Sequence, residues 1–166
     1  MLKTIGSLCI ILSGAAWGIS KALELKKNVY EWEKHMAFLQ AVGEELQCTL
    51  APVEQIICAV GKRKELQSFT PVAYFCSCLP CLLFPERWAQ ALNSYHTAPK
   101  GMKAALESFG QLFGMYQAQV QLEALKNLQE SARLHWQQAK DYCSTHSKLY
   151  STLGILGGLG AAILMM

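Results

Sequence analysis

Charged residues are missing from both ends of this chain of 166 residues. No Lys, Arg, Asp or Glu occurs between Thr4 and Ser20 or between Leu149 and Met166. This absence excludes ordinary surface helices, which carry polar residues along one face. At about 1.5 Å per residue, each stretch forms roughly 25 Å of helix, a little less than a hydrocarbon core of about 30 Å. The sequence therefore predicts transmembrane helices over 4–20 and 149–166.

Positive charge is concentrated between the two predicted spans and nearly absent from the chain ends beyond them. Of the fifteen Lys and Arg residues, only Lys3 precedes the first span and none follows the second. Because Lys and Arg are enriched on the cytoplasmic side of membranes, the segment 21–148 is predicted to be cytoplasmic, with both chain ends on the far side. A cleaved signal peptide is the alternative for the first span, but it leaves the second span unexplained. The sequence thus predicts a two-pass protein of the cell membrane that contacts lipid.

Motifs for catalysis and for nucleotide or nucleic-acid binding are missing as well. No His-Glu-x-x-His pattern places two metal ligands on one helix face. Gly61 and Lys62 lack the upstream glycine and the following Ser or Thr of a phosphate-binding loop. The net charge of +3, interleaved with twelve acids, is too small to indicate a nucleic-acid partner. We therefore predict that the protein is not an enzyme and holds no cofactor.

Three cysteines lie close together in the stretch FCSCLPC, at Cys76, Cys78 and Cys81. Thiolates at such short spacing can share a zinc ion, so a membrane-tethered thiol or zinc-binding enzyme is the alternative function. No fourth ligand is near, and the flanking Phe75 and Leu79 are typical of a packed core. These cysteines are accordingly predicted to be packing residues, with no metal bound.

Alternation of apolar and polar residues, the pattern of a half-buried strand, occurs nowhere in the chain. No proline precedes Pro52, so nothing interrupts a helix that leaves the first span. Along this helix, apolar positions recur at alternating steps of four and three, a heptad seam. A similar pattern after Gly114 predicts a long final helix that enters the second span. The residues of the first seam are Leu25, Val29, Trp32, Met36, Leu39, Gly43 and Leu46.

The five prolines mark the boundaries of four shorter helices between the long ones. Proline is favoured in the first turn of a helix and excluded from its interior, so its positions indicate helix starts. The predicted fold is all-α: a helical bundle of about six helices, with the long first and last helices continuing into transmembrane spans. The predicted starts are Pro52, Thr70 with Pro71, Pro85, and Thr97 with Pro99, and the third helix is expected to end by Pro80.

Two groups of residues are candidates for contacts with other helices or proteins. Within the predicted spans, small residues recur at every fourth position, a spacing typical of membrane helices that pack closely. The spans would pair within one chain or with a partner, including a second copy of this chain. The basic run Lys62, Arg63 and Lys64 could meet an acidic partner, with a solvated loop as the alternative. The small residues are Gly14, Gly18, Gly154, Gly158 and Ala162.

Several patches, in their order along the whole chain, resemble the stage III sporulation protein AB family of endospore-forming bacteria. The patches are MLKTIGSLCIILSGAAWGIS, LQAVGEELQCTLAPVEQI, Trp88, FGQLFG, and the closing LGILGGLGAAILMM. The chain departs from the family pattern at Phe113, where Leu is usual, and at Gln117, where Asp is usual, while Gln121 fits. The chain is therefore similar to this family as a divergent member.

The resemblance implies a membrane component of the mother-cell to forespore channel, in the mother-cell membrane around the forespore. Such a component is similar to the F-like platform proteins of type II secretion and to those of type IV pilus systems. The resemblance further implies a partner ATPase, stage III sporulation protein AA, and other membrane proteins of the channel complex. A scaffold of an ordinary secretion or pilus system is a further alternative, which the presence of one bundle rather than two disfavours.

Overall fold

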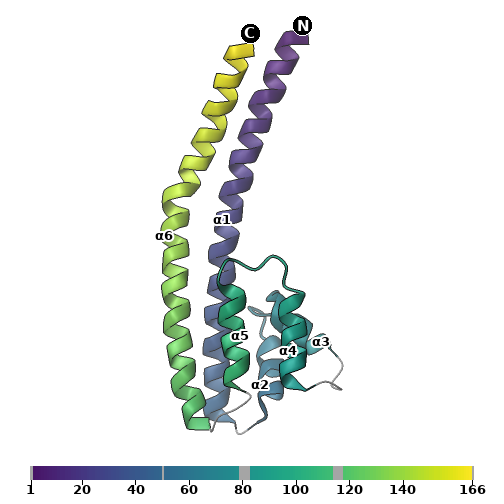
Figure 1. Cartoon of the computed structure of the whole chain (residues 1–166), viewed down its shortest axis with the longest axis vertical. Coiled ribbons are helices and arrows are strands. Elements are labelled where there is room, and N and C mark those ends of the chain that lie inside the picture. Colours follow the sequence, from purple (N-terminus) through teal and green to yellow (C-terminus); the bar gives the residue numbers. More distant parts are fainter. Residues whose placement is uncertain (1, 50, 79–82, 114–117, 166) are drawn as a thin grey trace. The chain divides into compact units, whose positions relative to one another are not determined.

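All regular secondary structure in the described part of the chain is α-helical, as the sequence predicts (Figure 1). The computed structural model describes residues 2–49, 51–78, 83–113 and 118–165. Two helices are long and the four between them are short, which confirms the predicted pattern of a helical bundle. The helices are α1 (Leu2–Cys48), α2 (Val53–Gly61), α3 (Thr70–Ser77), α4 (Phe84–Asn93), α5 (Met102–Leu112) and α6 (Ala118–Met165).

The prolines lie at or near the starts of the short helices. Pro52 precedes α2 by one residue, and Pro71 and Pro85 lie in the first turns of α3 and α4. The prediction for α5 is less accurate, because this helix begins at Met102, three residues after Pro99. Gly101 precedes α5 with a φ of 80°, a conformation that costs glycine little. The turn at this glycine, rather than the proline, thus sets where α5 begins.

The two segments predicted to cross a membrane, 4–20 and 149–166, are helical wherever the structure describes them. Over the described residues, however, no helix is both long enough and apolar enough to cross a membrane. The helices of this prediction are present, but the structure does not identify either as a span.

The chain forms two compact units whose boundaries fall inside α1 and α6. Unit 1 comprises Met1–Val29 and Gln137–Met166, and unit 2 comprises Tyr30–Trp136. The predicted division at residues 20 and 148 followed charge, whereas these boundaries follow contacts. In unit 1, α1 and α6 run antiparallel, so that both ends of the chain lie at the same end of the pair (Figure 1).

In unit 2, α1 packs against other helices on more than one face. Toward α6, the ring of Trp32 stacks on His135 with 4.9 Å between centroids, and Gln129 Nε2 donates a hydrogen bond to the Leu39 carbonyl over 3.1 Å. On another face, Phe38 is fully buried. Its ring joins an aromatic core supplied by the shorter helices and their connections. The other core aromatics are Phe69, Phe75, Phe84, Trp88, Tyr95, Phe109 and Phe113.

Trp88 is the centre of this aromatic core. Its ring lies 5.2 Å from Phe109 and 5.8 Å from Phe75 between centroids. Its indole Nε1 donates a hydrogen bond to the Leu106 carbonyl over 2.8 Å, which satisfies the one polar atom of the ring. A Cβ on Gly110 would lie 2.5 Å from Trp88 Cδ1, so only glycine lets α5 approach the indole this closely. These contacts fix α4 against α5.

Candidate functional site

The glycines of the two long helices meet at the closest approach in unit 1. A Cβ on Gly14 would lie 2.7 Å from the Gly154 carbonyl oxygen and 3.1 Å from the Gly158 Cα. A Cβ on Gly18 would lie 2.5 Å from the Tyr150 carbonyl oxygen and 3.2 Å from the Gly154 Cα. The obstructing atoms are backbone atoms, which cannot rotate away. The two helices therefore depend on the absence of side chains at these positions.

The contact is confined to one face of each helix. In α6, a Cβ on Gly157 or Gly160 would have no neighbour within 4 Å, and the same holds for Gly6 in α1. The small residues predicted to form a contact stripe thus include four that the structure brings together. The side chain of the fifth, Ala162, lies outside the described residues.

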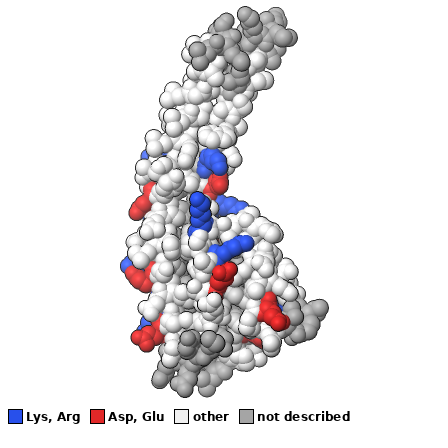
Figure 2. Space-filling model, in the orientation of Figure 1, with Lys and Arg blue, Asp and Glu red and all other residues white. Residues whose placement is uncertain are grey.

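The other faces of the paired ends expose large apolar side chains. Leu12 is 59% exposed and Ile163 is 73% exposed. On the face shown in Figure 2, no charged residue covers the white surface of these ends. A contiguous apolar surface of this kind is a typical site for contact with lipid or protein. The exposed apolar residues of these segments also include Trp17, Ile19, Leu23, Leu149, Leu153, Ile155, Leu156 and Leu159.

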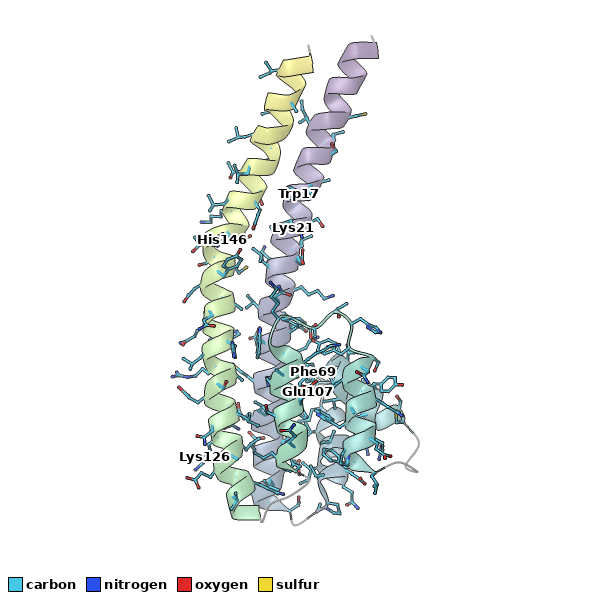
Figure 3. All side chains as sticks on the ribbon, viewed as in Figure 1. Trp17, Lys21, Phe69, Glu107, Lys126 and His146 are labelled. Carbon is cyan, nitrogen blue, oxygen red and sulfur yellow. The ribbon has the colours of Figure 1, made fainter. Side chains whose placement is uncertain are left out.

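Aromatic side chains cluster where the charge-free part of unit 1 ends. Trp17 meets Tyr150 edge-on with 6.4 Å between ring centroids, and Tyr142 stacks on His146 with 3.9 Å between centroids. Figure 3 labels Trp17 on α1 and His146 on α6. A hydrogen bond with the Tyr150 hydroxyl raises the pKa of Tyr142. Rings with one polar edge are enriched at the boundary between lipid and water.

The three basic residues after α2 are all exposed, and Arg63 among them forms ion pairs with α1. Arg63 donates hydrogen bonds to Glu44 over 2.8 Å and to Glu45 over 3.2 Å, which attaches the segment to α1. The bond from Arg63 lowers the pKa of the Glu44 carboxyl. Lys62 and Lys64 are exposed. Of the three predicted contact residues, Arg63 thus has a role within the chain, and the two lysines face solvent.

A buried polar network joins α1 to the segments around α3 and α4. The Tyr95 hydroxyl donates a hydrogen bond to Glu31 Oε2 over 2.7 Å, and Lys34 Nζ lies 3.6 Å from Glu31 Oε1. Lys34 also donates to the Ser68 carbonyl over 3.3 Å and lies 4.3 Å from the centre of the Tyr30 ring. Burial, followed by the bond to Glu31, raises the pKa of Tyr95. We assign this network a structural role, because its charges are paired with each other inside the fold.

A second buried polar residue, Arg87, closes the end of α3. Its guanidinium donates hydrogen bonds to the Phe75 carbonyl over 3.0 Å and to the Cys78 carbonyl over 3.4 Å. It also lies over the Phe75 ring, 4.3 Å from the ring centre. Carbonyls at a helix C-terminus lack partners within the helix, and a cation there is favourable. The sequence did not predict this role of Arg87. Arg87 lies on α4 whereas its acceptors lie at the end of α3, and no local pattern indicates a contact between the two.

His35 is held in its neutral form by the fold. Its side chain is 1% exposed, and no hydrogen-bond partner among the described residues reaches Nδ1. Burial, and to a lesser extent repulsion from His135, lowers the pKa of His35 from 6.5 to about 4. The Trp32 ring lies against both histidines, 5.7 Å from His35 and 4.9 Å from His135 between centroids.

Acid should therefore destabilise unit 2 through His35. The folded state binds the proton only below about pH 4, whereas the unfolded chain binds it below about 6.5. The free energy of unfolding is thus expected to fall as pH drops from 6.5 to 4, by about 3 kcal/mol in total. Thermal unfolding of the full chain at several pH values measures this loss. His35→Gln should flatten the profile and His96→Gln, at an exposed position, should not; equal profiles would contradict the assignment.

The described part of the cysteine cluster, Cys76 and Cys78, forms no metal site. The described residues contain no group of three or more potential ligands that could hold a metal ion. Burial is the main cause that raises the pKa of Cys76 to about 12, which opposes the thiolate that a nucleophile or ligand requires. Cys81 and the predicted helix end at Pro80 lie outside the described residues. The structure thus gives no support to the alternative of a thiol enzyme at Cys76.

A groove of about 480 Å³ lies between α4 and α5 beside the Trp88 indole. Glu107, labelled in Figure 3, is the charged residue among those that line it, and Ala89 and Leu92 contribute apolar surface. The sequence did not predict this groove, because its two walls come from separate helices whose contact depends on Gly110.

Comparison with known proteins identifies one family. The sequence profile of the family described as stage III sporulation protein AB matches residues 3–166. This range covers both units and all six helices. No curated protein and no solved structure matches the chain.

Proposed function

Because the chain belongs to the stage III sporulation protein AB family, we propose that it is a non-enzymatic membrane platform of the mother-cell to forespore channel. In this proposal the paired ends of α1 and α6 enter the mother-cell membrane around the forespore, and unit 2 faces the mother-cell cytoplasm. Unit 2 contacts a partner ATPase, stage III sporulation protein AA, and the membrane proteins of the channel complex surround the helix pair.

The glycine contact in unit 1 is the observation that carries the membrane part of this proposal. Gly14 and Gly18 bring α1 against the α6 backbone, so the two helices present their apolar side chains outward together. In water this arrangement leaves a large apolar surface exposed, which is unfavourable at about 25 cal/mol per Å². In lipid the same surface is solvated by acyl chains, and close backbone contact is a usual means of helix association.

The distribution of charge supports the proposed orientation. Lys21, Lys26 and Lys27 follow the charge-free part of α1, and Lys140 and Lys148 precede that of α6. Cations in these positions favour the cytoplasmic side and anionic lipid headgroups. The Trp17 and Tyr150 rings lie at the same level of the pair as this change in charge.

Coupling to an ATPase is supported by the continuity of the long helices. Both α1 and α6 contribute to unit 1 and to unit 2 without a break in the helix. A force applied to unit 2 can therefore reach the membrane helices through hydrogen-bonded backbone. The exposed Lys62 and Lys64 are the proposed contact with the ATPase, since an acidic surface would pair with them.

Deletion of the gene in its host tests the proposal. We expect sporulating cells to arrest after engulfment, as seen by microscopy and by the loss of late forespore reporter activity. The unsubstituted gene should restore heat-resistant spores. The allele with Lys62→Glu and Lys64→Glu should restore them poorly, because it reverses the charge of the proposed contact.

The matched control for these alleles is Lys126→Glu, which reverses an exposed charge on α6 in unit 2. It should restore spores fully, and immunoblots should show equal amounts of all three proteins. Normal spores in the deletion strain would overturn the channel function. Full rescue by the double charge reversal would overturn only the basic contact.

A further inference from the structure

Two free cysteines lie near each other where α3 packs against α2. Cys58 is on α2 and Cys76 is on α3, and neither is in a disulfide. Cys76 Sγ donates a hydrogen bond over 4.0 Å to the carbonyl oxygen of Ile57, the residue before Cys58, which places the Cys76 sulfur at the turn of α2 that carries Cys58. Eighteen positions of sequence separate the two cysteines, so only the folded unit brings them together.

Gly61 explains why the two helices approach so closely here. A Cβ on Gly61 would lie 2.9 Å from Val72 Cγ1 and 3.1 Å from Cys76 Sγ. The Cys76 side chain thus occupies the space above α2 that a larger residue at position 61 would fill. The position of the Cys76 sulfur beside the turn that carries Cys58 is a consequence of this tight packing, which limits how far that sulfur can move away.

We propose that Cys58 and Cys76 form a redox site, in which a peroxide or a small disulfide oxidises the two thiols to a disulfide between α2 and α3. With hydrogen peroxide, two S–H bonds break and one S–S bond forms, and the two protons and two electrons released cleave the O–O bond of the peroxide to give two water molecules. With a small disulfide, the electrons pass to that disulfide, which leaves as two thiols. The oxidant is external in both cases.

The surroundings of the pair favour the oxidised product over an isolated thiolate. Cys76 is exposed and Cys58 is partly exposed, so a small oxidant can reach the pair. The Cys76 sulfur itself is partly buried against α2, and this partial burial raises the pKa of Cys76 to about 12 because the thiolate loses hydration. A disulfide has no charge, and the same surroundings do not penalise it. Oxidation should therefore be slow at neutral pH and faster as pH rises, with a stable product.

The cross-link would close the segment 59–75, which contains the exposed lysines Lys62 and Lys64. A closed segment has fewer conformations available, in the folded unit as well as in the unfolded chain. Oxidation would thereby restrict the basic segment that faces the proposed ATPase. This consequence rests on the proposed function, whereas the redox pair itself does not.

Mass spectrometry of the full chain tests the proposal. The reduced chain, purified in detergent, is treated with hydrogen peroxide or with oxidised glutathione, and free thiols are then alkylated. Before alkylation, we expect the intact mass of most chains to be about 2 Da below that of the reduced chain, the two hydrogens lost per disulfide. Digestion should yield one peptide pair that joins Cys58 to Cys76, and a reductant should separate it. The oxidised chain should also unfold at a higher temperature.

Serine variants supply the controls. Cys58→Ser or Cys76→Ser should abolish the cross-link, whereas Cys78→Ser, two residues away, should retain it. The proposal is overturned if Cys58 and Cys76 stay open to alkylation while other cysteines link, if Cys76 links to Cys78 or Cys81, or if the disulfide joins two chains. The peptide map of the wild-type chain is sufficient to decide between these outcomes. A variant that fails to fold therefore does not change the conclusion. None of these outcomes bears on the sporulation phenotype.

Discussion

Replacing Gly154 with leucine is expected to separate α1 from α6 in unit 1 and to abolish function in sporulation. A Cβ at this position would lie 2.6 Å from the Gly14 carbonyl oxygen and 3.0 Å from the Gly18 Cα. These are backbone atoms, so the helices must move apart, at a cost of about 1–3 kcal/mol or more. Thermal unfolding of the full chain in detergent, and counts of heat-resistant spores in a complemented deletion strain, measure the two effects.

The matched control for this prediction lies one turn along the same helix. Gly157→Leu makes the same chemical change, but a Cβ on Gly157 has no neighbour within 4 Å. It should leave both the unfolding temperature and the spore count close to those of the unsubstituted chain. If Gly157→Leu were as harmful as Gly154→Leu, leucine would act through helix propensity or lipid contact, and the helix contact would not be the cause. Gly18→Leu, which faces the Tyr150 carbonyl, should reproduce the effect of Gly154→Leu from the other helix.

The helices were predictable because their signals are local. Heptad spacing and the absence of proline predicted α1 and α6, and prolines predicted the starts of α2, α3 and α4 to within one residue. The start of α5 was less predictable, since it depends on the positive φ of Gly101 rather than on Pro99. The spacing of Gly14 and Gly18, and of Gly154 and Gly158, also lies within single turns of helix and could be read from the sequence.

Contacts between distant segments were not predictable by the same reasoning. Tyr95 and Glu31 are 64 positions apart, and their hydrogen bond depends on how α4 ends beside α1. The heptad seam predicted one contact face on α1, but Phe38 lies off that seam and is fully buried. A helix that packs on more than one face has apolar residues around much of its circumference, so a single seam understates its buried surface.

The burial of two charged residues on α1 was likewise not predictable from the sequence. Glu31 and Lys34 lie on either side of Trp32 in the seam, and their i, i+3 spacing resembles that of an ordinary surface pair. Yet their side chains are only 10% and 8% exposed. A surface pair would contribute little to stability, whereas a buried pair makes each partner depend on the other. Removal of one partner is therefore the informative experiment.

Glu31→Ala is expected to destabilise unit 2 by about 3–5 kcal/mol, the range for breaking a buried ion pair. Without the carboxylate, the buried Lys34 ammonium loses its counterion. Its remaining contacts are the hydrogen bond to the Ser68 carbonyl and the face of the Tyr30 ring. The Tyr95 hydroxyl loses the acceptor that it reaches over 2.7 Å. Thermal unfolding of the full chain in detergent, followed by the fluorescence of the buried tryptophans, measures the loss.

Glu33→Ala is the control, because Glu33 is on the same helix and exposed. It should change stability by less than about 0.5 kcal/mol, as most surface substitutions do. A second test replaces the whole network with apolar residues, through Glu31→Met, Lys34→Met and Tyr95→Phe together. Since no buried charge then remains unpaired, much of the stability should return. A triple variant no more stable than Glu31→Ala would mean that the shape of these side chains, and not the pairing of their charges, holds α1 in unit 2.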